Sequence, residues 1–290
     1  MRAPTIALAA LLLSVPLLAP AADPVQRDAA GNRLEPLQLQ NPDDTAAPLR
    51  YCTADGQWCV RALPATAADQ PGVLEVAERV HEAAEPQMRH VPVTVGEDDG
   101  QDGDLQVWPF IVRLAPAAGD TRQLTDPRQA SLEDVLVGTL VERRAMYSGG
   151  GASASTLQLA RIGHLDEGIQ IDDNVLNVAW SANKMIRACF SERDFDQRAG
   201  ACHDEYSFDA ELALAADAQA MPVLHYRSRA TNYPAGVSSQ RDSLAMARLK
   251  KKDLRTEEDA ECSYTRVFRF SSGRYQPDRP LPECSGYTEP

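Results

Sequence analysis

The sequence predicts an all-β protein, an antiparallel β-sandwich or jelly-roll-like fold with few short helices, stabilised by disulfide bonds. Three observations lead to this fold class. Short runs rich in β-branched and aromatic residues recur along the chain and are separated by turn residues. Helical periodicity is scarce. The chain has six cysteines, an even number, behind an N-terminal segment typical of exported proteins. Many short strands separated by turns favour an antiparallel sandwich.

The first residues have the pattern of a signal peptide. Arg2 supplies a positive charge, residues 6–18 are apolar, and residues 19–21 are small enough for signal peptidase. The apolar run is too short to span a bilayer. We therefore expect residues 1–21 to be removed and the mature chain to begin near Ala22, in the periplasm or outside the cell.

The composition of the chain then predicts its division into segments. Residues 22–48 are rich in Pro, Asp, Gln and Ala without apolar periodicity, so we expect an extended or disordered arm. Residues 49–290 are expected to form the principal β domain. Residues 115–130, a Pro/Ala/Asp/Gln connection, are where a subdivision of that domain would fall.

Strand patterns follow one another in the first half of that domain. The runs 49–52 and 58–61 flank an Asp-Gly pair, which favours a tight hairpin turn. Residues 73–84 fit a strand and a helix equally well. The run 91–95 is β-branched but contains a proline, which predicts an edge strand. The run 105–114 is the densest apolar stretch after the N-terminal segment and predicts a buried strand.

The second half contains the longer alternations. Residues 135–147 predict one long strand, and the glycine-rich run 148–153 predicts a turn. Helical patterns are confined to residues 190–198 and 240–250. Further strands are expected at 156–162, 168–171, 175–178, 185–189, 206–214, 223–227, 264–270 and 273–275.

The cysteines are spaced so that pairing each with its nearest neighbour closes three short loops. Each such disulfide stabilises a chain by roughly 2–3 kcal/mol in the chain-entropy model. A zinc site is the competing interpretation, but no Cys-x-x-Cys or His-x₃₋₅-His spacing is present. The expected disulfides are Cys52–Cys59, Cys189–Cys202 and Cys262–Cys284.

The net charge of the chain limits the classes of partner that it can bind. The formal net charge is −13, which repels nucleic acid and anionic lipid surfaces. We therefore expect no nucleic-acid partner. No stretch after the N-terminal segment is long and apolar enough to cross a membrane, so no membrane span is expected in the mature chain. A protein of the cell envelope or a glycan remains as the expected ligand.

Histidines and carboxylates supply the candidate catalytic residues. His203 stands beside Asp204 and Glu205, and His225 could join them from a neighbouring strand as a general base or metal ligand. On a strand, His203 and Glu205 would share a face, whereas His203 and Asp204 would not. The alternative is a disulfide-pinned loop whose charges face water.

An acidic loop is the candidate metal site. Asp98, Asp102 and Asp104 lie at spacings similar to those of a calcium-binding loop. Gly100 replaces the acidic residue of the third position, and Pro109 stands where a closing carboxylate is needed. No cofactor is predicted, and an irregular calcium site is the alternative to an exposed acidic loop.

Three further patterns carry competing interpretations. Residues 181–184 match the Ser-x-x-Lys spacing of penicillin-recognising serine enzymes, but that family's Ser-Asp-Asn and Lys-Thr-Gly motifs are missing. The glycines at 149–151 are interpreted as a flexible turn rather than an oxyanion loop, because no Gly-x-Ser-x-Gly is present. The tryptophans and tyrosines would line a sugar- or peptide-binding face or fill the core. They are Trp58, Trp108, Trp180, Tyr226, Tyr233, Tyr275 and Tyr287.

These patterns favour an exported, non-enzymatic binding module for a protein or a cell-envelope ligand, such as an inhibitor or immunity-type factor. The interpretation depends on missing catalytic signatures together with a crosslinked scaffold. Two alternatives remain open. One is an envelope hydrolase that uses His203 and a carboxylate, and the other is a calcium-dependent carbohydrate-active module.

Overall fold

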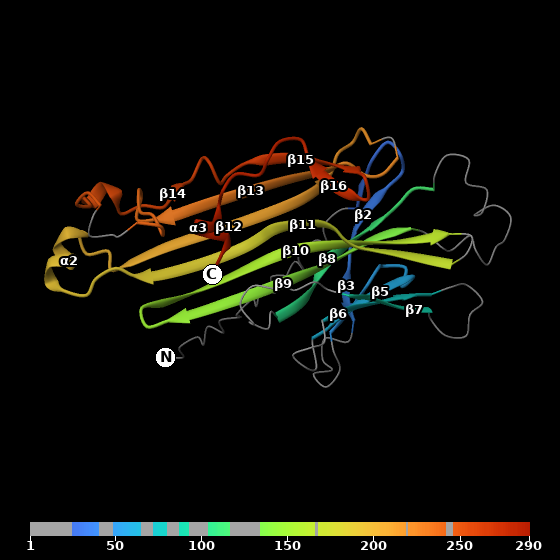
Figure 1. Ribbon diagram of the computed structural model, residues 1–290, viewed down its shortest axis with the longest axis horizontal. Helices are drawn as coiled ribbons and strands as arrows, with labels where there is room; N and C mark the ends of the chain where they lie inside the picture. Colours follow the sequence, from blue (N-terminus) through green and yellow to red (C-terminus); the bar gives the residue numbers. More distant parts are fainter. Residues whose placement is uncertain are drawn as a thin grey trace, which may run out of the picture.

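The chain folds into two antiparallel β-sheets, which confirms the predicted fold class (Figure 1). The computed structural model describes residues 25–40, 49–64, 72–79, 87–92, 104–116, 134–165, 168–218, 220–241 and 246–290. Within these ranges, no helix has the length and apolarity needed to cross a membrane.

The larger sheet has eleven strands, and most neighbours in it are also neighbours in the chain. Its order is β1-β2-β8-β9-β10-β11-β12-β13-β15-β16, with β14 paired to β13. The strands are β1 (Gln26–Arg27), β2 (Arg33–Pro36), β8 (Asp104–Arg113), β9 (Val135–Tyr147), β10 (Gly150–Leu165), β11 (Gly168–Arg187), β12 (His203–Leu214), β13 (Leu224–Tyr233), β14 (Glu257–Glu258), β15 (Thr265–Ser271) and β16 (Arg274–Pro277).

A bulge divides the larger sheet into two layers. Trp180 of β11 is the extra residue where the register between β10 and β11 shifts. Beside this bulge β12 leaves β11, and beyond Asp209 it pairs only with β13 in the described chain. The strands β12 to β16 can therefore fold back over β8 to β11.

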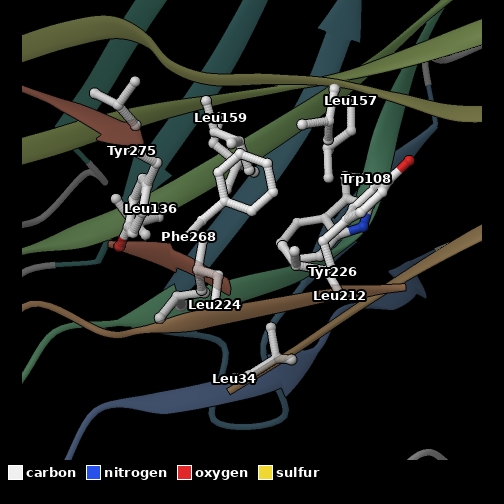
Figure 2. Packing of buried hydrophobic residues seen from close by; sticks show 14 of the residues in the cluster. Leu34, Trp108, Leu136, Leu157, Leu159, Leu212, Leu224, Tyr226, Phe268 and Tyr275 are labelled. Carbon is white, nitrogen blue, oxygen red and sulfur yellow. The ribbon is translucent and has the colours of Figure 1, made fainter. Parts of the chain in front are cut away.

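The main hydrophobic core lies between these two layers. Figure 2 shows Trp108 of β8 and Leu157 of β10 pointing toward Tyr226 of β13, with Phe268 of β15 beside them. Trp108 and Tyr226 have no exposed surface. The Tyr226 hydroxyl donates a hydrogen bond to the backbone oxygen of Ala179 at 2.7 Å, which satisfies the polar end of this buried side chain.

The smaller sheet has five strands and covers the outer side of the larger one. Its order is β3-β4-β5-β6-β7. Apolar residues of this sheet, among them Trp58 and Val76, form a second core with Val137 and Ile162 of the larger sheet. The strands are β3 (Gln38–Gln40), β4 (Arg50–Cys52), β5 (Trp58–Leu63), β6 (Val73–Glu78) and β7 (Gln87–Pro92).

All three predicted disulfides are confirmed. Cys52–Cys59 joins β4 to β5, Cys189–Cys202 closes the loop between β11 and β12, and Cys262–Cys284 ties the C-terminal segment to the loop before β15. That loop between β11 and β12 contains the helix α2 (Glu192–Gln197), and the C-terminal segment contains the short helix α3 (Ser285–Thr288).

Most predicted elements of the first half are confirmed. The 49–52 and 58–61 runs form the β4–β5 hairpin, and residues 73–78 of the ambiguous run form a strand. Residues 91–92 of the predicted edge strand end β7 at the edge of its sheet, while 80–84 and 93–95 lie outside the described residues. The predicted arm differs, because residues 25–40 supply β1, β2 and β3 to the sheets. The predicted signal peptide and most of the 115–130 connection lie outside the described residues.

Three expectations for the second half are corrected. The strands expected at 168–171, 175–178 and 185–189 are parts of the single 20-residue strand β11. The turn expected at 148–153 is shorter, since β10 already begins at Gly150. A Cβ at Gly150 would collide with the carbonyl of Met185, so glycine permits the close pairing of β10 and β11. The helix expected at 240–250 is absent from residues 240–241 and 246–250, and residues 242–245 lie outside the described residues.

Candidate functional site

Three rows of side chains cross strands β9 to β13 on one face of the larger sheet, which we call the open face. Residues paired across strands share a face, as do residues two positions apart along a strand. The row nearest α2 is Met146, Gly151, Met185, Glu205 and Tyr233; the second is Arg144, Ser153, Asn183, Ser207 and Thr231; the third is Glu142, Ser155, Ser181, Asp209 and Arg229.

A groove with a volume of about 800 Å³ crosses the first two rows. It is lined by residues of all five strands and is open to solvent. Ligand pockets of proteins have volumes of roughly 300–1,000 Å³. The groove is therefore large enough for a ligand of substantial size.

Small side chains form the floor of the groove. A Cβ at Gly151 would lie 2.8 Å from Sδ of Met146, so glycine at this position lets the methionine lie over the strand. Ser153, Ser207 and Thr231 are also short, and the hydroxyls of Ser207 and Thr231 are hydrogen-bonded at 2.7 Å. The floor can therefore offer hydroxyl groups to a ligand without blocking its approach.

Apolar side chains border the groove at the end of the sheet. Met146 is 86% exposed and Phe190 is 73% exposed. Met185 is also exposed. The guanidinium carbon of Arg187 lies 5.1 Å from the centroid of the Phe190 ring, which holds this ring beside the sheet. Solvent-exposed apolar side chains gathered beside a groove are typical of interaction surfaces.

The loop that carries Phe190 is firmly held. Cys189–Cys202 closes it, and the Ser191 hydroxyl caps α2 by accepting a hydrogen bond from the backbone N–H of Asp194 at 3.2 Å. Below it, the buried side chains of Arg198 and Asp204 form an ion pair. Burial raises the pKa of Asp204, and the Arg198 charge opposes that shift.

The predicted candidates His203 and Glu205 do share a face. Both lie on the open face, where His203 pairs with Arg187 and Glu205 with Met185, and only Glu205 lines the groove. Asp204 points to the opposite face and is buried. His225 is paired with Ala213, ten residues along β12 from His203. At about 3.3 Å per residue this separates the two histidines by roughly 33 Å, so they do not form one site.

The Ser-x-x-Lys pattern is split between the two faces of β11. The Ser181 hydroxyl is 2.7 Å from that of Ser155 on the open face. Lys184 lies on the other face, where its Nζ donates to the backbone oxygen of Gly286 at 3.3 Å. Burial lowers the pKa of Lys184. The two side chains cannot exchange a proton, so this geometry contradicts a Ser–Lys catalytic pair.

The acidic candidates for calcium are not brought together in the described part of the chain. Asp104 opens β8, and its carboxylate forms an ion pair with Arg144 at 3.2 Å. Asp98 and Asp102 lie outside the described residues. Among the residues that the structure describes, no group of three His, Cys, Asp or Glu side chains could hold a metal ion.

The aromatic residues mostly fill the cores. Trp58, Trp108, Tyr226 and Tyr275 are buried, which is the core alternative of the sequence prediction. In the described part of the groove Tyr233 is the one member of that set with side-chain access to a ligand on the open face.

Comparisons with protein-family models, with curated proteins and with solved structures find no match to this chain.

Most residues that line the groove were not predicted as site residues from the sequence. Met146, Ser153 and Met185 belong to stretches that were predicted as separate strands or as a turn. Their common face depends on the register of two successive hairpins, β9–β10 and β10–β11, and the turn expected at 148–153 is confined to residues 148–149. The small residues that alternate with alanine in 151–155 are a local pattern that could have indicated a solvent-facing row.

Proposed function

We propose that the protein is a non-enzymatic binding module that receives a protein partner in the groove of the open face. The observation that carries this proposal is the groove itself, which combines a floor of short hydroxyl side chains with an exposed apolar border. Interfaces often have this combination, because apolar anchors supply free energy and polar groups fix orientation.

The composition of the border favours a protein over a glycan. Methionine side chains are flexible and polarisable, and they are common on surfaces that accept varied protein side chains. Met146 and Met185 both line the groove. Sugar rings are usually bound against aromatic platforms, and in the described lining Tyr233 is the single aromatic residue on the open face.

The arrangement of titratable groups also supports binding rather than hydrolysis. His203 lies outside the groove lining, and Asp204 is turned away and paired with Arg198. A general base needs a partner or substrate within hydrogen-bond reach. Glu205 and His203 are the residues that the hydrolase alternative would require.

We further propose that the protein acts in the periplasm or outside the cell, as an inhibitor or immunity-type factor would. Three disulfides support an oxidising compartment. The signal-peptide pattern of residues 1–21 supports the same location, with a mature N-terminus at Ala22 or Asp23. Sequencing the N-terminus of periplasmic material would test it, and a retained Met1 would contradict it.

The test of binding is a capture experiment with matched variants. Ser153→Trp fills the floor of the groove, whereas Asp209→Trp places the same side chain on the same face outside it. We expect an envelope protein to be captured in stoichiometric amount by the unmodified chain and by Asp209→Trp, and lost with Ser153→Trp.

The three chains must first show the same melting temperature, so that loss of capture reports on the groove. The purified partner should then be titrated with each of the three chains. The measured affinities should follow the capture result, with the unmodified chain and Asp209→Trp binding tightly and Ser153→Trp binding weakly. Equal capture by both variants would overturn the assignment of the groove. Turnover of an ester, glycoside or peptide substrate that disappears with His203→Ala would overturn the binding function itself.

A further inference from the structure

We infer that the groove takes an extended peptide segment in which a Lys or Arg side chain, flanked by apolar residues, meets the carboxylate of Glu205. This inference names the partner chemistry of the proposed binding function and rests on it.

The charged residues of the groove indicate that its ligand is basic. Glu205 is exposed, and within the described chain its carboxylate has no ion-pair or hydrogen-bond partner. Arg144, at the other end of the groove, is already occupied, because its guanidinium lies 3.0 Å from Glu142 and 3.2 Å from Asp104. Lys184 is also among the residues that line the groove, but its Nζ is turned to the opposite face, where it donates to the backbone oxygen of Gly286 at 3.3 Å. The charge left for a ligand is therefore negative.

The neighbours of Glu205 define what flanks the basic side chain. Glu205 is paired with Met185 on β11 and with Tyr233 on β13, so its carboxylate stands between an apolar and an aromatic side chain. Such an arrangement suits an aliphatic stem that packs on Met185 and Tyr233 while its charged end reaches Glu205. A free cation or a sugar would leave the methionine without a contact.

The length of the groove favours an extended segment. It crosses five strands that are about 4.8 Å apart, which gives a length of roughly 19 Å. An extended peptide of about six residues has this length at roughly 3.3 Å per residue.

The field of the whole chain acts in the same direction. With a formal net charge of −13, the protein attracts basic partners at long range and repels acidic ones. Glu205 would turn this general attraction into a position-specific contact.

The experiment is a selection of peptides on the intact chain. A displayed library of random heptapeptides is panned on the immobilised protein and on two variants, Glu205→Lys and Asp209→Lys. Both variants make the same charge change on the same strand and face, but Asp209 lies outside the groove. We expect the unmodified protein and Asp209→Lys to enrich Lys or Arg flanked by apolar residues, and Glu205→Lys to lose this enrichment.

The best peptide is then synthesised and titrated. We expect Glu205→Lys to weaken its binding by on the order of tenfold and Asp209→Lys by about twofold or less, with the difference shrinking at high salt. Enrichment of acidic or uncharged peptides, or equal effects of the two variants, would overturn the inference. If capture of the envelope partner still depends on Ser153, the proposed function survives that result; if capture is independent of the groove, both fail.

Discussion

The contact between Asp55 and Arg113 provides a direct test of how the two sheets are joined. Asp55 lies in the β4–β5 turn, and its carboxylate accepts a 2.6 Å hydrogen bond from Arg113 of β8. The Arg113 side chain is only 3% exposed and also lies 3.3 Å from Glu35. Asp55→Asn would remove the charge that faces this buried cation while it keeps the shape of the side chain.

The expected cost follows from these contacts. A hydrogen bond to a charged group contributes about 1.5–3 kcal/mol, and half-exposure of Asp55 reduces this value. We expect Asp55→Asn to lower the free energy of unfolding by about 1–2 kcal/mol, or the melting temperature by roughly 3–6 °C. Asp209→Asn is the control, since that carboxylate is exposed and should change stability by less than about 0.5 kcal/mol.

The pH dependence gives a second measure of the same contact. Burial alone would raise the pKa of Asp55, but hydrogen bonds from Thr53, Gln57 and Arg113 outweigh it and lower the pKa from 3.8 to about 2. A lowered carboxyl pKa stabilises the fold above the unfolded-state value, and this stabilisation is lost as pH falls through the folded-state value. Urea unfolding of both chains should therefore show a difference that is full at pH 5 and small at pH 2. A difference that is constant from pH 5 to pH 2 would refute this reasoning.

Three further substitutions test the core, the loop and the candidate histidine. Tyr226→Phe loses the hydrogen bond to Ala179 and should destabilise the fold by about 1 kcal/mol, which thermal unfolding can measure; no change would mean that this bond contributes nothing. Asp204→Ala leaves the buried Arg198 unpaired and should cost about 3–5 kcal/mol, with hydrogen exchange rising first in the loop between β11 and β12; a neutral result would contradict the pairing. His203→Ala should change the melting temperature by less than about 2 °C and leave partner capture intact; lost capture would extend the site to His203.

The sequence predicted those parts of the fold that depend on local patterns. Turn residues between two apolar runs indicated the β4–β5 hairpin, and the short separations of the cysteines indicated all three disulfides. The strand β9 was predicted with its observed bounds because residues 135–147 are rich in β-branched residues and alternate over part of their length.

Elements that depend on distant partners were not predictable in this way. The strand β2 has little apolar periodicity, yet Leu34 is buried because β8 and the folded-back layer cover it. In β11, two register shifts interrupt the alternation, one at Trp180 and one between Asp172 and Leu176, so one strand resembled several. The groove is a product of register among five strands. The β9–β10 and β10–β11 registers follow from short turns, but longer connections join β11, β12 and β13, and local sequence does not specify the register of those strands.

Hydrogen exchange of the module with and without its captured partner tests the central claim most directly, because it reports which backbone segments a ligand covers. We predict that protection rises in segments 144–146, 151–153, 183–185, 205–207 and 231–233, which cross the groove from β9 to β13. Protection confined to the smaller sheet, with these five segments unchanged, would contradict it.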